Sequence, residues 1–192
     1  MSFVLTVLLA LLSAAQSVSA ADARVIAADF VQTRRLAGMD MAVRISGSMV
    51  CERGGRLRWQ VDSPVRSVTV IEPDKLTHFD RETGKLAVVP KTAFPWLKIL
   101  RDSLDDWLSG DPKRLEGKFD TAASSPDTLV LTPRDAEILR LYRRAEIRFA
   151  PDGKTVRSVR LEESSGDVLS IEFLRVRSDP VLPANLWRMP PE

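Results

Sequence analysis

The chain has 192 residues with one cysteine and one histidine, and its 28 basic and 26 acidic side chains leave a formal charge of +2 at pH 7. A single cysteine excludes an intramolecular disulfide framework. The balanced charge, with arginines scattered singly along the chain, is not typical of a nucleic-acid groove, where basic residues cluster with aromatic ones.

The first twenty residues carry no charged side chain and include a short apolar run from Phe3 to Leu12. This run is too short to span a bilayer, and Val18-Ser19-Ala20 places small residues where a signal peptidase cuts. We therefore expect residues 1–20 to be a cleaved signal peptide and residues 21–192 to form one periplasmic domain. An uncleaved anchor is the alternative, because no Lys or Arg precedes the run.

Residues 22–36 are predicted to form a helix, because Ile26, Ala27 and Phe30 share a helical face and no Gly or Pro interrupts. Short segments with strand character and tight connections follow, which predict an antiparallel meander. We expect these strands at residues 41–50, 56–61, 67–71, 75–80 and 85–89. Gly47 should mark a bulge or bend in the first of them.

The strand at residues 56–61 alternates strictly, with Leu57, Trp59 and Val61 on one face. Gly54-Gly55 predicts a turn before it, and Pro64 ends it because proline has no N–H for the ladder. Trp59 needs either a thick core or a cavity, and the pattern leaves both open.

The pattern changes after Pro90. Apolar residues recur at helical spacing, which predicts one or two amphipathic helices within residues 92–110. The apolar residues of this pattern are Leu97, Leu100, Leu104, Trp107 and Leu108. A second block of strands is predicted at residues 128–132, 141–149, 155–162, 168–176 and 184–189.

Groups that perform chemistry are scarce. His78 is predicted to be an ordinary strand histidine and Cys51 a small buried apolar residue. Asp102, Asp105 and Asp106 alternate with basic residues, as on a solvated helix face. We expect no enzyme, metal or cofactor; a hydrolase that uses carboxylates alone is the enzymatic alternative.

An apolar sheet face and amphipathic helices to cover it remain. These elements can form a closed core, or a half-open barrel whose helices cover a lipid-sized cavity.

Several motifs follow one another along the chain: Phe30-Val31-Gln32-Thr33-Arg34, Gly47, Arg53 before Trp59 and Pro64, Val130-Leu131-Thr132-Pro133, Pro151-Asp152-Gly153, Gly166, and Leu186-Trp187-Arg188-Met189-Pro190-Pro191. Their order and spacing resemble those of the LolA family of periplasmic lipoprotein carriers. The resemblance implies one strongly curved antiparallel sheet, an incomplete β-barrel closed by a helical lid. It also implies a monomeric carrier that takes acylated cargo from an inner-membrane release complex to an outer-membrane acceptor.

The resemblance further implies that Arg53 holds the lid through hydrogen bonds to its backbone, with Arg44, Arg56 and Arg58 as competitors. A solvated arginine at a turn is the other interpretation of Arg53. The residues expected to line the cavity or lid are Phe30, Leu57, Trp59, Val61, Val68, Val70, Phe79, Phe94, Trp96, Leu97, Leu100, Leu104, Trp107 and Leu108. The segment from Leu108 to Phe119 resembles more divergent members, so the cargo is a lipoprotein or another acylated lipid. A sensing module of the same fold, without transport, is the alternative function.

Overall fold

The computed structural model describes residues 23–52, 55–90, 119–153 and 155–190. These residues build one sheet of eleven strands, in which all neighbouring strands are antiparallel. The strands are β1 (Val25–Arg35), β2 (Ala42–Glu52), β3 (Arg56–Ser63), β4 (Ser67–Ile71), β5 (Lys75–Asp80), β6 (Lys85–Pro90), β7 (Phe119–Ser125), β8 (Thr128–Pro133), β9 (Tyr142–Phe149), β10 (Val156–Glu163) and β11 (Val168–Ser178). One short helix, α4 (Ala136–Leu139), lies among the described residues.

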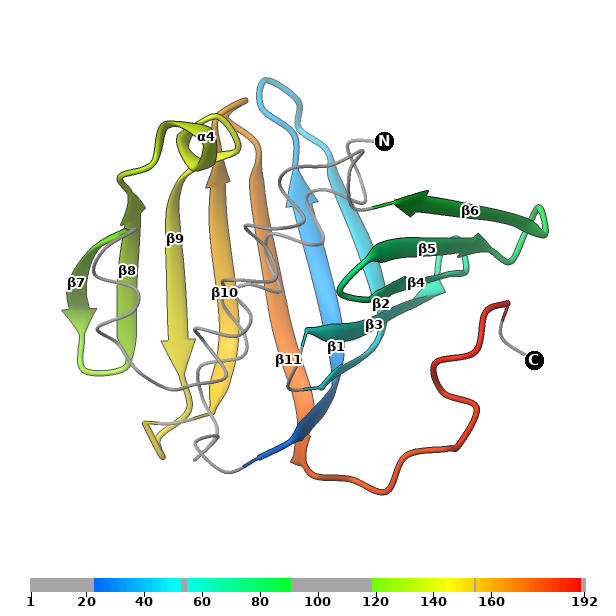
Figure 1. Cartoon of the computed structure of the whole chain (residues 1–192). Helices are drawn as coiled ribbons and strands as arrows, with labels where there is room; N and C mark the ends of the chain where they lie inside the picture. The colour runs from blue at the N-terminus through cyan, green and yellow to red at the C-terminus, as the bar shows by residue number, and fades with distance from the viewer. Residues whose placement is uncertain (1–22, 53–54, 91–118, 154, 191–192) are drawn as a thin grey trace.

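The sheet consists of two meanders joined at its centre. Its order is β6-β5-β4-β3-β2-β1-β11-β10-β9-β8-β7, so the first strand pairs with the last. β6 and β7 are the two edges, and the sheet does not close on itself. Figure 1 shows that β8–β11 stand side by side while β3–β6 run across them, because the sheet twists strongly along its width. The predicted open antiparallel sheet is thereby confirmed.

The helix predicted for residues 22–36 is wrong, because this segment is the strand β1. It pairs with β2 from Val25 to Arg35 and with β11 along nearly its whole length. The spacing of Ile26 and Phe30 fits a helix face, but it fits a strand face equally well, since both residue numbers are even. Pairing on both sides decides between the two, because each neighbouring strand supplies partners for the backbone of β1.

The other predicted strands are confirmed, except the last. Residues 184–189 form turns instead, in which Leu186 N–H donates to the Pro183 carbonyl at 3.1 Å and Arg188 N–H to that of Asn185 at 3.0 Å. The edge strand β7 was not predicted, since its sequence after Phe119 is small and polar. The short helix α4 was not predicted either.

The predicted helical lid finds no support in the described residues, whose only helix is α4. The segment for which it was predicted, residues 92–110, lies outside them, as do the signal peptide at residues 1–20 and Gly54. Gly55 has the positive φ, +86°, expected of the turn before β3.

Candidate functional site

One face of the sheet is largely apolar from β3 to β8, and Ile71 and Leu76 extend it in one row onto β4 and β5. Cross-strand partners point to the same side of a sheet, so the register aligns Ile26, Cys51 and Leu57 in one row and Ala28, Met49 and Trp59 in the next. The second meander continues this face with Leu131, Ala145, Ile147, Val159, Leu161, Leu169, Ile171 and Phe173. All of these side chains are buried, so this face, which we call the apolar face, holds the hydrophobic core of the described chain.

An aromatic stack lies near the middle of the apolar face. The rings of Phe30 and Trp59 are parallel within 19°, with centroids 3.7 Å apart. Gly47 is opposite Phe30 on β1 and opposite Val61 on β3, two residues from Trp59, at the predicted irregularity of β2. The absence of a side chain on Gly47 leaves the space that the Phe30 ring occupies.

Two buried polar atoms on the apolar face have no partner among the described residues. They are the amide oxygen Oε1 of Gln32 and the indole N–H of Trp59, on side chains that are 2% and 3% exposed. An unpaired buried polar atom costs about 1–3 kcal/mol. Such atoms are rare in folded proteins, and where they occur, water or a bound molecule is a common hydrogen-bond partner for them.

Arg34 closes one end of the apolar face with a cluster of ion pairs. Its Nη2 lies 2.8 Å from a Glu163 carboxylate oxygen and 2.7 Å from one of Asp167. The Ala37 backbone N–H donates to Asp167 at 2.9 Å. This hydrogen bond, followed by those from Arg34, lowers the pKa of the Asp167 carboxyl. The cluster therefore joins the end of β1 to the β10–β11 turn.

The opposite face carries the C-terminal segment. Arg58 donates from Nη1 to the Leu186 carbonyl at 2.7 Å, and the Arg56 guanidinium lies 4.2 Å from the centre of the Trp187 ring. Burial, together with the nearby Arg81, lowers the pKa of Arg58. Arg58 therefore makes the kind of hydrogen bond to a backbone carbonyl that was expected of a lid-holding arginine. Its partner, Leu186, belongs to the C-terminal segment.

The predicted lining residues divide between the two faces. Phe30, Leu57, Trp59 and Val61 lie together on the apolar face. Val68, Val70 and Phe79 lie on the opposite face, because their register partners there are Gln60 and Arg58. Outside the described residues lie Arg53, Phe94, Trp96, Leu97, Leu100, Leu104, Trp107 and Leu108.

Three residues of the site were not singled out as site residues from the sequence: Gln32, Arg34 and Gly47. Gln32 and Arg34 follow Phe30 at a spacing of two, so they share its face once the segment is a strand. The helix prediction concealed this relation. Of the arginines considered beside Arg53, Arg44 is exposed, whereas Arg56 and Arg58 contact the C-terminal segment.

His78 lies on β5 in the row of Trp59, with Nδ1 2.9 Å from the Thr69 hydroxyl oxygen. Burial lowers the pKa of His78, and the nearby Asp80 carboxylate opposes this shift. The His78 imidazole therefore binds a proton more readily in the unfolded chain than in the folded one.

We expect the free energy of unfolding to fall as the pH drops below about 6.5, the pKa of an unperturbed histidine. This contribution is complete above the unfolded pKa and is lost as the pH falls toward the lower folded pKa. Urea unfolding at pH 8 and pH 5.5 measures it, with His78→Gln as the control that should show a smaller change. An equal pH dependence in both proteins would contradict the assignment.

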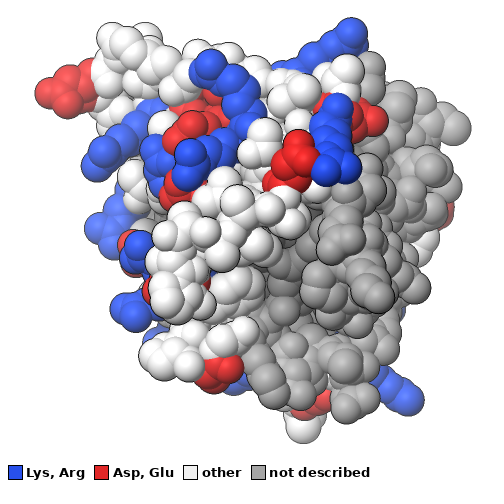
Figure 2. All heavy atoms as spheres, turned by 90° about the vertical axis from the view of Figure 1, so that its left-hand side faces the viewer, with Lys and Arg blue, Asp and Glu red and all other residues white. Residues whose placement is uncertain are grey.

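Figure 2 shows basic and acidic side chains side by side on the face it presents. In the described ranges no helix is long and apolar enough to cross a membrane, and no three His, Cys, Asp or Glu side chains gather there as a metal site. The apolar face is the candidate site because it gathers the buried apolar side chains together with the two polar atoms of Gln32 and Trp59 that lack a partner among the described residues.

The sequence of this chain is similar to those of outer-membrane lipoprotein carrier proteins. An outer-membrane lipoprotein carrier protein from Legionella pneumophila (strain Corby) is 26% identical over 149 residues, which are 77% of this chain and 70% of the relative. One from Nitrosospira multiformis is 23% identical over 180 residues, 88% and 80% of the two chains.

A solved structure of an uncharacterized conserved protein from Thermus thermophilus shares the fold, with a TM-score of 0.56 and 10% identity over 90% of each chain. The family model described as outer membrane lipoprotein carrier protein LolA matches residues 21–190. The chain therefore belongs to the LolA family.

Proposed function

We propose that this protein is a non-enzymatic carrier that shuttles acylated cargo through the periplasm from the inner to the outer membrane. The cargo is a lipoprotein or a related acylated lipid whose chains lie against the apolar face. The observation that carries the proposal is this face itself, which is continuous over an open sheet and contains unpaired polar atoms. Curated relatives named as lipoprotein carriers support the same assignment.

Burial of hydrocarbon provides the affinity in this proposal. Each buried CH₂ of an acyl chain contributes about 0.8 kcal/mol, so one chain is held firmly against water. No bond forms or breaks. The Oε1 of Gln32 accepts a hydrogen bond from an amide N–H of the cargo, and the Trp59 indole donates to an ester or amide carbonyl.

The proposal also includes the expected signal peptide at residues 1–20, an inner-membrane release complex, an outer-membrane acceptor, and Arg53 as the residue that holds a lid. A sensing module of the same fold would bind lipid without passing it on. A transfer assay from loaded protein to acceptor vesicles separates the two, since only a carrier delivers its cargo.

The direct test is the content of the protein itself. The full chain, exported to a bacterial periplasm and purified without detergent, should carry acyl-chain species in native mass spectrometry and lipid extraction. It should also bind an environment-sensitive apolar dye that an acylated peptide displaces. A protein that carries no acyl species and binds no dye would refute the carrier proposal.

Gln32→Leu tests the polar part of the site. We expect unchanged or higher stability, because the change removes an unpaired buried amide oxygen, and about fivefold weaker binding of an N-acylated peptide, the cost of one hydrogen bond. Binding of a pure hydrocarbon dye should not change. Thr33→Val, on the same strand but the opposite face, is the matched control. If both variants bind the peptide equally well, Gln32 has no role in cargo recognition.

A further inference from the structure

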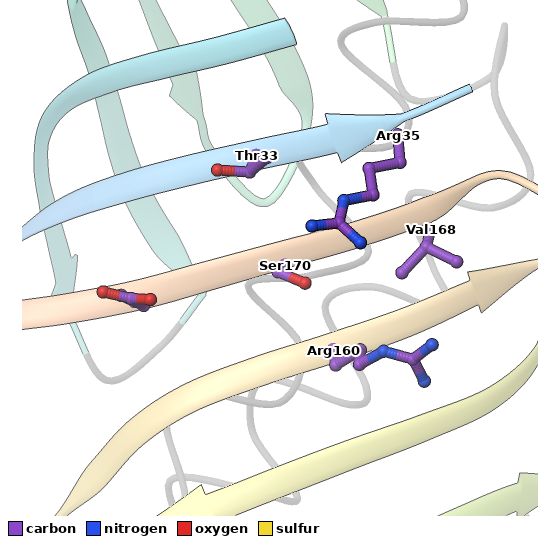
Figure 3. A pocket seen from close by; sticks show the side chains of 6 residues that line it. Thr33, Arg35, Arg160, Val168 and Ser170 are labelled. Atoms are coloured by element: carbon purple, nitrogen blue, oxygen red, sulfur yellow. The ribbon is translucent and has the colours of Figure 1, made fainter. Parts of the chain in front are cut away.

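A recess lies on the face opposite the apolar face, over β1, β11 and β10. It is a hollow of about 330 Å³ lined by Thr33, Arg35, Arg160, Val168, Ser170 and Glu172. Figure 3 shows long arginine side chains from β1 and β10 flanking short side chains on β11. The hollow forms because Val168, Ser170 and Thr33 are short, whereas Arg35 and Arg160 beside them are long.

The register brings the polar groups of the hollow together. Thr33, Ser170 and Arg160 are partners in one row across three strands, so their Cβ atoms are about 5 Å apart from strand to strand. Arg35 pairs with Val168, which makes Ser170 its diagonal neighbour, within reach of a long side chain. Figure 3 shows the Arg35 side chain extending from β1 over β11 toward Ser170.

Most of these groups are available to a ligand. Arg160 is committed, since its Nη1 lies 2.6 Å from a Glu162 carboxylate oxygen. The side chains of Thr33, Arg35, Ser170 and Glu172 have no hydrogen bond or ion pair in the described part of the chain. A guanidinium and two hydroxyl groups therefore meet at one end of the hollow, with a carboxylate at the other.

The two charges are too far apart in the register to neutralise each other. Arg35 is opposite Val168, and Glu172 lies four residues further along β11. Ser170 and Glu172 are two residues apart on one strand, which is about 7 Å. If Arg35, Thr33 and Ser170 hold an anionic group, a cationic group joined to that anion by a short linker would reach the Glu172 carboxylate.

We propose that this hollow binds a small zwitterion that carries a phosphate and a primary ammonium group, the chemistry of phosphoethanolamine. Arg35 donates to two phosphate oxygens, an arrangement for which its planar fork is suited, and the hydroxyl groups of Thr33 and Ser170 donate to the phosphate. Glu172 accepts from the ammonium. The site is separate from the apolar face and does not depend on the carrier function.

Calorimetric titration of the full mature chain with O-phosphoethanolamine tests the proposal, with inorganic phosphate and ethanolamine titrated separately. We expect the zwitterion to bind at least tenfold more tightly than either half. Arg35→Gln should weaken binding at least tenfold, and Glu172→Gln should reduce the zwitterion to the affinity of phosphate. Arg177→Gln, an exposed arginine on β11 outside the hollow, is the matched control and should bind normally.

Vesicles identify the source of the zwitterion. Sedimentation with phosphatidylethanolamine vesicles, lost in Arg35→Gln but not with Arg177→Gln, would support a lipid headgroup as ligand. Binding of the soluble compound without vesicle binding would support a free metabolite. Absence of both, or binding that Arg35→Gln leaves unchanged, would overturn the proposal without affecting acyl-chain binding, which the dye assay reports.

Discussion

Gly47→Ala is expected to lower the free energy of unfolding by about 4 kcal/mol or more, at the extreme of single substitutions. A Cβ at this position would lie 1.9 Å from the backbone oxygen of Gln60 and 2.9 Å from Cζ of Phe30. The first contact is with backbone of the neighbouring strand, which cannot rotate away as a side chain can. Relief therefore requires separation of β2 from β3 or loss of the Phe30–Trp59 stack.

Urea unfolding followed by tryptophan fluorescence and far-UV circular dichroism measures this effect. Gly38→Ala is the control, because Gly38 has a φ of +73° with nothing within 4 Å of a new Cβ, so it adds only backbone strain of about 1 kcal/mol. Equal losses in the two variants would show that the space beside Gly47 is not tightly restricted.

Arg34→Leu is expected to cost about 3 kcal/mol of stability, the lower end for removal of one partner from a buried ion pair. The change leaves Glu163 and Asp167, each 13% exposed at the side chain, without their shared cation. Arg35→Leu, one residue further and on the opposite face, should change stability by no more than about 0.5 kcal/mol. Equal costs in the two variants would contradict the cluster.

The pH dependence gives a second measure of the same cluster. Because the pKa of Asp167 is lowered in the folded protein, its contribution is present above the unfolded value of about 3.9 and is lost as the pH falls through the folded value. The stability difference between the native protein and Arg34→Leu should therefore narrow below about pH 4. A difference that stays constant down to about pH 2 would contradict an ionic role.

Local patterns predicted most of the sheet. Residues 67–71 and 75–80 were bounded correctly because alternation, Pro and Gly define short strands within a few residues. The same reasoning found the apolar side of β3. It failed for β1, whose apolar residues fit both periods, and for residues 184–189, where Trp187 packs on Arg56 instead of joining a ladder.

The sequence by itself determined the class of the protein: an antiparallel sheet, one apolar face, and few groups that could catalyse a reaction. Only the tertiary structure decided which residues meet. The pairing of β1 with both β2 and β11 turned Gln32 and Arg34 toward the apolar face and placed Arg35 beside Ser170. In a strand, neighbouring residues point to opposite faces, so the long-range pairing that makes a segment a strand also assigns each of its side chains to one of the two faces of the sheet.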